Sequence, residues 1–410
     1  MLNRREIMRS APAFAAAGTV TAAGSMAPAA VVLAQAAAGA TAAHKPVVMK
    51  AGANVNLVDD NTMRAVARWG IKNCYAFASI ADPERLYPTV DELKTMQDIA
   101  QRNGVNVDIL RPLNLTMSNI DDEKYPAIML GQSPQRDRDI EAFQNTIKNC
   151  AEAGISGMRY TLSIVGNTRS RTAPGRGDAI YVGSRMTDYS GPPRNANRTV
   201  PTAADQVAGD GAPRRRGGGP NRGLINKSIT RAGRITADMY WERITYFLDR
   251  VVPVANQYKI KLASHMEDAM VPLGYEGVDL VTNTVEGAKK FVSIQNSPYH
   301  GLLFCIGTFS EMLQNPGKDI YDVVQWFGAN KKIHLVDFRN IRGNRQDFVE
   351  TFPDEGDIDM LRVMQILRDT GYDGMVVPDH TPQSPGGPEQ VDAFQYGYIR
   401  GLLQAVGRLG

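Results

Sequence analysis

Four residues of metal-ligand type stand near the ends of short apolar segments. They are His265, Cys305, Asp337 and Asp379, within the local sequences KLASHMED, GLLFCIGT, KIHLVDFRN and GMVVPDH. Imidazole, thiolate and carboxylate donors together suit Mn2+, Fe2+, Co2+ or Zn2+ better than Mg2+ or Ca2+. A lone strand cysteine is often only a small buried residue, and an aspartate after a strand often caps a helix. Four such residues at equivalent positions nevertheless indicate a divalent-metal site and the chemistry of a metalloenzyme.

The elements that must position these ligands alternate regularly along the chain. Apolar stretches of strand length occur at 47–54, 72–79, 106–112, 157–164, 261–267, 301–307, 332–339 and 374–379. Stretches of helical periodicity follow them at 60–69, 90–103, 137–153, 237–257, 284–296, 318–328, 357–370 and 391–407. Eight such strand–helix units predict a closed parallel (β/α)8 barrel (TIM barrel), whose active site lies at the C-terminal ends of the strands.

One segment interrupts this alternation. Residues 166–234 lie between the fourth strand and its helix, and the part at about 187–233 is rich in Gly, Pro, Arg and Ala. Because few of its residues could support a core, we expect a long flexible insertion on the active-site face. A solvated loop is the favoured interpretation. The alternative is a lid, or a contact with an anionic polymer through Arg214, Arg215 and Arg216.

The first residues have the composition of an export signal. Arg4 and Arg5 precede an Ala/Gly-rich, mildly apolar run that ends at Ala34-Gln35-Ala36. This pattern predicts a twin-arginine signal peptide over residues 1–36, a periplasmic location, and a mature single barrel domain over residues 37–410. The run is weakly apolar and short for a membrane span, so we expect no stable anchor after processing.

The charge balance and the cysteines exclude other classes of protein. The 410 residues include 46 Lys and Arg against 43 Asp and Glu, with no continuous basic face to bind nucleic acid. The three cysteines are too few and too irregularly spaced for a disulfide framework. We therefore expect a small-molecule substrate. The sequence leaves open whether identical chains associate into a homo-oligomer.

Taken together, the strand-end motifs resemble those of the mannonate dehydratases, whose barrel is related to that of xylose isomerase. His265-Met266-Glu267-Asp268 resembles the motif His-Pro-Asp-Asp, and Phe304-Cys305-Ile306-Gly307-Thr308 resembles Phe-Cys-Thr-Gly-Ser. Asp337-Phe338-Arg339-Asn340 resembles His-x-Arg-Asn, and Val377-Pro378-Asp379-His380 resembles Arg-Pro-Asp-His. The likeness extends upstream through LGQSPQRDRDIEAFQNTIKNCAEAGI and to Arg171-Thr172.

The resemblance implies a metal-dependent sugar-acid dehydratase that converts D-mannonate to 2-keto-3-deoxy-D-gluconate, with Mn2+ or Fe2+ as the metal. His380 follows a ligand directly and is a candidate acid or base, or else a hydrogen-bond partner of a ligand. Tyr396 corresponds to the family's catalytic tyrosine, with Tyr398 as its competitor.

Three further residues are candidates for binding the sugar acid. Arg339 shares a strand face with Asp337 and could hold a carboxylate, or pair structurally with an aspartate ligand. Arg171 is a loop arginine that could close over the substrate or remain solvated. Asp268 completes the first motif.

The sequence also departs from the family pattern. Asp337 stands where the family has a metal-binding histidine, and His334 lies on the opposite face of the same strand. Tyr160-Thr161 replaces a Tyr-Asn pair. These changes favour an alternative function: an exported isomerase, epimerase or glycoside-processing lyase that acts on a neutral sugar. A third hypothesis is a carbohydrate-binding protein that has lost catalysis.

Overall fold

The computed structural model describes residues 45–82, 84–189, 229–268, 270–380 and 382–408. The predicted signal peptide and the arginines at 214–216 lie outside the described residues. Among those described, no helix combines the length and the apolar composition that a membrane span requires.

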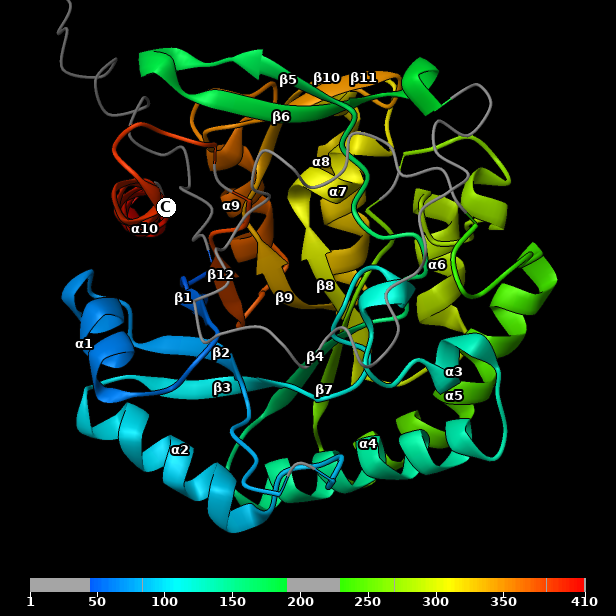
Figure 1. Ribbon diagram of the computed structural model, residues 1–410. Coiled ribbons are helices and arrows are strands. Elements are labelled where there is room, and N and C mark those ends of the chain that lie inside the picture. The colour runs from blue at the N-terminus through cyan, green and yellow to red at the C-terminus, as the bar shows by residue number, and fades with distance from the viewer. Residues whose placement is uncertain (1–44, 83, 190–228, 269, 381, 409–410) are drawn as a thin grey trace, which may run out of the picture. The chain divides into compact units, whose positions relative to one another are not determined.

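Eight parallel strands close into a barrel, as the sequence predicts (Figure 1). Around the barrel their order is β1, β12, β9, β8, β7, β4, β3, β2. Their bounds are Lys50–Val55 (β1), Asn73–Phe77 (β2), Asn106–Arg111 (β3), Gly157–Thr161 (β4), Lys261–His265 (β7), His300–Cys305 (β8), Ile333–Asp337 (β9) and Met375–Val377 (β12). Every predicted strand is therefore present.

Eight main helices follow these strands. They are α1 (Asp60–Arg68), α2 (Val90–Arg102), α4 (Gln135–Glu152), α5 (Ala237–Tyr258), α6 (Val285–Ser293), α8 (Pro316–Ala329), α9 (Met360–Asp369) and α10 (Pro388–Arg408). The short helices α3 (Ala127–Leu130) and α7 (Ile306–Glu311) are additional. Local sequence determines where the helices begin. At α2, for example, Thr89 and Glu92 form a reciprocal capping box that satisfies backbone N–H groups at the helix start.

Alternation along the barrel strands separates two packing faces. Residues such as Leu303, Leu335 and Val377 form a buried cluster inside the barrel, and Cys305 belongs to the same cluster. The opposite face packs against the helices, where Phe143 and Phe247 meet edge to face with ring centroids 5.1 Å apart. An inward-facing residue at the C-terminal end of a strand, such as Cys305, therefore lies at the mouth of the barrel.

A second, antiparallel sheet, here called the accessory sheet, has the strand order β10, β11, β6, β5. Its strands are β5 (Arg171–Pro174), β6 (Ile180–Arg185), β10 (Asn340–Asn344) and β11 (Asp347–Thr351). It joins the insertion after β4 to a hairpin after β9, and Figure 1 shows it beyond the arrowheads of β8 and β9.

The accessory sheet corrects one prediction. A long insertion after β4 is confirmed, but it is not a flexible loop from its beginning, because residues 171–185 form two strands. They gain their stability from a small core of their own, in which Tyr181 packs with Val349 and Phe352. Composition alone does not reveal this core, because three of its five buried residues, Val349, Phe352 and Val391, come from far along the chain.

Candidate metal centre

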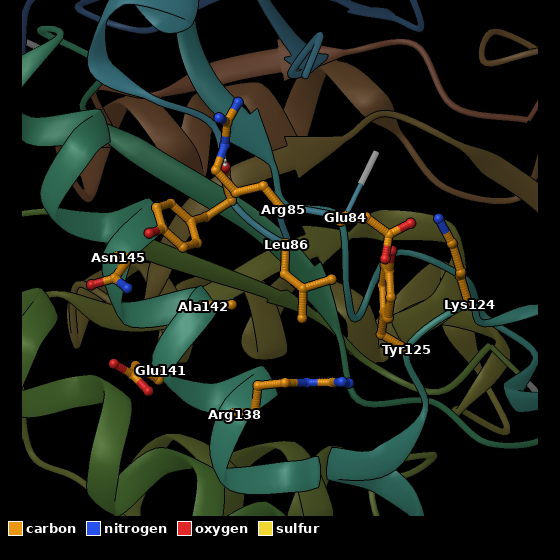
Figure 2. Close-up of a pocket in the computed structure, with 10 residues that line it drawn as sticks. Glu84, Arg85, Leu86, Lys124, Tyr125, Arg138, Glu141, Ala142 and Asn145 are labelled. Atoms are coloured by element: carbon orange, nitrogen blue, oxygen red, sulfur yellow. Dashed lines mark hydrogen bonds between the residues drawn. The ribbon is translucent and has the colours of Figure 1, made fainter. Parts of the chain in front are cut away.

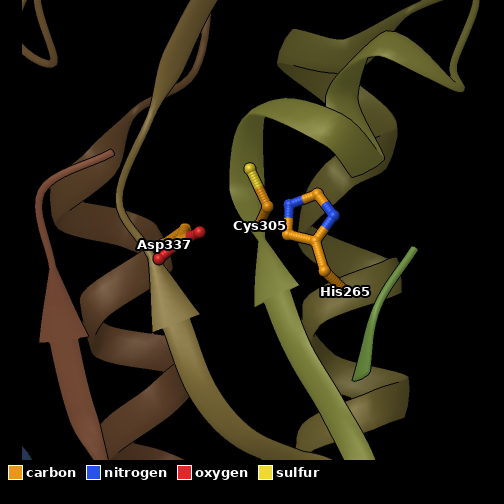
Figure 3. Close-up of side chains that lie close together, drawn as sticks. All are labelled: His265, Cys305 and Asp337. Atoms are coloured by element: carbon orange, nitrogen blue, oxygen red, sulfur yellow. The ribbon is translucent and has the colours of Figure 1, made fainter. Parts of the chain in front are cut away.

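The predicted ligands meet at the C-terminal ends of adjacent strands. His265, Cys305 and Asp337 are the last residues of β7, β8 and β9, and Cys305 lies beside Asp337 in the strand register. One ligand atom from each of these three residues lies within 4.8 Å of the others (Figure 3). Asp379 joins them, because its Oδ2 is 3.3 Å from Cys305 Sγ. The structure thus brings together all four ligands predicted from the sequence.

The donor set fits a divalent cation. Asp337 Oδ1 is buried and accepts no hydrogen bond from the residues that the structure describes. Burial, and then the neighbouring charge of Asp379, raise the pKa of Asp337 to about 8. Burial likewise raises the pKa of Cys305 well above its ordinary value. Anionic ligands held this closely need a cation or protons, so a metal ion would bind here by displacing protons.

His265 is set up as a neutral ligand. Its Nδ1 lies 2.6 Å from the carbonyl oxygen of Met266, an arrangement in which Nδ1–H donates and Nε2 keeps its lone pair. Burial, followed by the charge of Arg159, lowers the pKa of His265 to about 4. The imidazole therefore stays unprotonated and able to bind a metal near neutral pH.

His334 lies apart from this centre, as strand alternation predicts. It is buried, and its Nδ1–H donates to the carbonyl oxygen of Leu262 at 2.9 Å. The interior position on β9 belongs to Leu335 and then to Asp337. The contacts of His334 are those of a structural residue.

A buried network of arginines and carboxylates adjoins the ligands. Arg339 is fully buried, and its Nη1 lies 3.1 Å from Asp268 and 2.5 Å from Glu350. Its Nη2 lies 3.1 Å from Glu311, and its Nε is 3.4 Å from Asp379 Oδ2. Because Arg339 Nε is this close to the predicted ligand Asp379, the network and the candidate metal centre are contiguous.

A second arginine completes the network. Arg169, from the loop between β4 and β5, places its Nη2 3.0 Å from Asp268, 3.4 Å from Glu311 and 2.5 Å from Glu350. The two arginines thus share three carboxylates. Buried charges need partners of opposite charge. Because Glu350 lies on β11, the network links the accessory sheet to the barrel.

His380 connects the network to the metal ligands. Its Nδ1 is 2.7 Å from Glu350 Oε1 and 2.8 Å from Arg339 Nη1. Its Nε2 is 3.3 Å from Asn167 Nδ2 and 3.7 Å from Asp379 Oδ1. Burial alone would lower the pKa of His380, but the charges of Asp379 and Glu350 raise it above its ordinary value. The side chain is 30% exposed, so the imidazole is accessible, as its predicted role of acid or base requires.

The other predicted site residues have different surroundings. Asp268 belongs to the buried network. Arg171 lies on β5, where its Nη2 is 2.6 Å from Asp347 Oδ1 within the accessory sheet. Tyr396 lies on α10, is 4% exposed, and is part of the main core. The catalytic and substrate-binding roles of His380, Arg339, Asp268, Arg171 and Tyr396 stay predictions.

Three residues of the site were not predicted from the sequence. Glu350 lies on β11 and Glu311 on α7, two elements that the strand–helix alternation does not include. Arg169 lies two residues before Arg171, and the structure shows that it is the arginine of this loop that enters the network. A single charged residue within a short, mainly apolar stretch, as in FVETF and TFSEML, is the available signal for the two glutamates.

A separate cavity of about 470 Å3 lies between the loop before α2 and the first half of α4 (Figure 2). Its lining includes Arg85, Tyr87, Lys124, Tyr125 and Arg138. None of the four predicted metal ligands lines it. The metal centre is therefore not part of this cavity.

The fold and the site together define a (β/α)8 barrel with a candidate metal centre at the C-terminal ends of its strands. Comparison with known families gives a match of residues 89–408 to the model of D-mannonate dehydratase. This match covers most of the chain, and the chain belongs to the D-mannonate dehydratase family.

Individual relatives agree with the family match. Mannonate dehydratase of Thermotoga petrophila is 24% identical over 333 residues, which cover 78% of this chain and 87% of that protein. The enzyme of Geobacillus thermodenitrificans is 28% identical and covers 72% of this chain and 76% of its own. The crystal structure of mannonate dehydratase from Streptococcus suis serotype 2 is similar in fold, with a TM-score of 0.67, 20% identity, and coverage of 88% and 95% of the two chains.

Proposed function

We propose that this protein is a metal-dependent hydro-lyase that converts D-mannonate to 2-keto-3-deoxy-D-gluconate and water. One observation carries the proposal: in a member of this family, four ligand residues meet at the barrel mouth directly beside the imidazole of His380. The substrate class follows from the family, and the acid–base chemistry follows from this arrangement.

His265, Cys305, Asp337 and Asp379 would hold the metal ion, with Mn2+ or Fe2+ as the best fit to the mixed donor set. When bound, the ion would polarise the substrate oxygens and stabilise the negative charge that develops as the proton next to the carboxylate leaves. The remaining chemistry belongs to side chains of this chain.

The elimination requires two proton transfers: a base takes the proton from C2, and an acid gives a proton to the hydroxyl that leaves C3 as water. A C2=C3 double bond forms. The resulting enol then loses its hydroxyl proton and takes up a proton at C3 to become the keto acid. The charges of Asp379 and Glu350 raise the pKa of His380 above its ordinary value, which favours the protonated imidazole and suits the role of acid toward the departing hydroxyl. Tyr396 is the second proton-transfer candidate, on the ground of the resemblance.

The alternative substrate is a neutral sugar, for an isomerase or epimerase on the same barrel. The family match does not favour it, so neutral sugars are the natural negative controls. We also propose that the mature enzyme is periplasmic, on the basis of the pattern of residues 1–36 alone.

The direct test uses the purified mature chain loaded with Mn2+ or Fe2+. We expect D-mannonate, but not D-mannose, to give a 2-keto-3-deoxy acid, and we expect Asp379→Ala to abolish the product. Arg185→Met, which changes an exposed residue of the accessory sheet, serves as the control and should keep full activity. A folded, metal-loaded protein that leaves D-mannonate intact would contradict the proposal.

A further inference from the structure

Arg159 faces the interior of the barrel just below the metal centre. It lies on β4, where the register pairs it with Ala263 of β7, two residues before the pairing of Thr161 with His265. Ala263 belongs to the buried cluster inside the barrel. Because alternate residues of a strand share a face, Arg159, Thr161 and their partners Ala263 and His265 all point into the same space.

Arg159 differs from the two arginines of the buried network, because it has no carboxylate partner in the part of the chain that the structure describes. Among the described residues, no carboxylate oxygen lies within 4.0 Å of its guanidinium nitrogens, and its buried Nε makes no hydrogen bond. Arg339 and Arg169, in contrast, are each held by several carboxylates. A partly buried guanidinium without an anionic partner is unfavourable. The position of Arg159 therefore favours binding of an anionic ligand that enters the barrel.

The charge of the candidate metal centre explains why a positively charged side chain is needed near it. A thiolate and two carboxylates around a divalent ion leave one net negative charge, because this chain has Asp337 among its ligands. A negatively charged centre repels an anionic substrate unless a cation stands nearby. Arg159 lies on β4 two residues before Thr161, whose register partner is the predicted ligand His265. Its charge is therefore close to the centre.

A second arginine stands beside it. Arg111 is the last residue of β3 and shares the inward face of Ile109, which the register pairs with Gly157 of β4. The same register, extended by two residues, brings Arg111 next to Arg159. The Arg111 guanidinium carbon lies 3.8 Å from the centre of the Phe77 ring, so the side chain is supported within the barrel mouth.

We infer that Arg159 binds the carboxylate of the substrate and thereby selects sugar acids over neutral sugars. This inference rests on the proposed function for the identity of the substrate, and it deepens it by naming the residue that recognises the acid group. Arg339 shares a strand face with Asp337, but its guanidinium is fully buried and held by carboxylates of the protein. Arg159 presents a planar, two-pronged donor that suits a carboxylate.

The test measures ligand binding and turnover separately. The metal-loaded wild type, Arg159→Met and Arg159→Lys are titrated calorimetrically with D-mannonate, D-gluconate and D-mannose, and their metal content is determined. We expect Arg159→Met to weaken binding of both acids by about thirtyfold or more, as for loss of a charged hydrogen-bonded pair. KM for D-mannonate should rise in parallel. Arg159→Lys should keep part of the affinity, because lysine keeps the positive charge but cannot donate two parallel hydrogen bonds to a carboxylate.

The controls separate this role from others. Arg185→Met should bind the acids as the wild type does, and binding of D-mannose should not respond to Arg159→Met. Circular dichroism checks folding, and Arg159→Gln replaces Arg159→Met if the latter does not fold. Unchanged acid affinity in the folded variant would overturn the inference. The inference would also be overturned if the variant lost metal but its metal-loaded fraction bound sugar acids with normal affinity. Arg159 would then only balance the charge of the metal centre.

The failure of the proposed function is distinguishable from the failure of this inference. If the wild type binds sugar acids in an Arg159-dependent way but does not dehydrate D-mannonate, the proposed reaction is wrong and the carboxylate site stands. If the wild type dehydrates D-mannonate and Arg159→Met does so with unchanged KM, the reaction stands and the carboxylate site is wrong.

Discussion

Glu350 Oε1 and His380 Nδ1 lie 2.7 Å apart, although one residue belongs to the accessory sheet and the other follows the last barrel strand. The same glutamate oxygen lies 2.5 Å from Nη1 of Arg339 and from Nη2 of Arg169. The accessory sheet is therefore part of the site, since it supplies the carboxylate that orients the imidazole beside the metal ligands.

The first prediction concerns the charge of Glu350. Glu350→Gln removes one of the two negative charges that raise the pKa of His380, so the neutral imidazole becomes more favourable and its pKa falls. In a plot of kcat against pH, the part of the curve that reflects the protonation of His380 should move to lower pH. The pH dependence of D-mannonate turnover measures this shift, with the exposed Glu389→Gln as the matched control. An unmoved limb in a folded, metal-loaded variant would show that Glu350 does not act through His380.

The second prediction concerns the metal ligands. Cys305→Ala and Asp337→Ala should each lose the bound metal on dialysis, because each removes one donor of a four-residue set. Asp337→His should retain metal, since a neutral imidazole remains a good donor for the same ions. Elemental analysis of the dialysed proteins gives the answer. Full metal content in Cys305→Ala would place the ion elsewhere.

The third prediction concerns stability in acid. Burial is the largest influence that lowers the pKa of His300 and of His334, to about 4 each. Because the folded-state pKa lies below the unfolded value of about 6.5, the unfolded chain binds more protons between these limits. Stability is then fully present above the unfolded pKa and falls as the pH drops toward 4.

Because the unfolded chain takes up more protons, each of these histidines should lower the free energy of unfolding by about 1.5 to 2 kcal/mol when the pH falls from 7 to 5. Urea unfolding of the wild type and of His300→Leu at both pH values measures the effect. The variant should lose less stability between the two pH values by about this amount. Equal losses would mean that the pKa of His300 in the folded protein is not lowered from its unfolded value.

The fourth prediction concerns export. Replacing Arg4 and Arg5 by lysine keeps the charge but removes the arginine pair typical of twin-arginine signals. We expect the wild type to be found in the periplasm without residues 1–36, and the double variant to be retained in the cytoplasm at full length. Cell fractionation and mass spectrometry of the N-terminus test this. Normal processing of the double variant would argue against the twin-arginine route.

Much of the fold follows from local sequence. Strand-length apolar segments alternate with amphipathic helices, and both periods are visible without knowledge of distant residues. The ends of parallel strands meet at one side of the barrel, so His265, Cys305, Asp337 and Asp379 could be placed together in advance. Strand alternation also separated His334 from this set.

The remainder of the site depends on contacts between distant segments. The accessory sheet pairs Val349 with Gly183, residues that only the folded chain brings together, and neither segment alternates clearly. Glu350 therefore had no predicted position. For Arg159 the reason is different. Its strand was predicted, but only the positions of the carboxylates in the folded protein show that none among the described residues pairs with it.

One measurement tests the central claim most directly. The metal-loaded protein is incubated with D-mannonate in D2O, and the product is examined by NMR and mass spectrometry. Elimination through an enol predicts 2-keto-3-deoxy-D-gluconate with one carbon-bound deuterium at C3, because the enol takes that proton from the solvent. Recovery of D-mannonate, or of an isomer that has kept all its oxygens, would contradict the account.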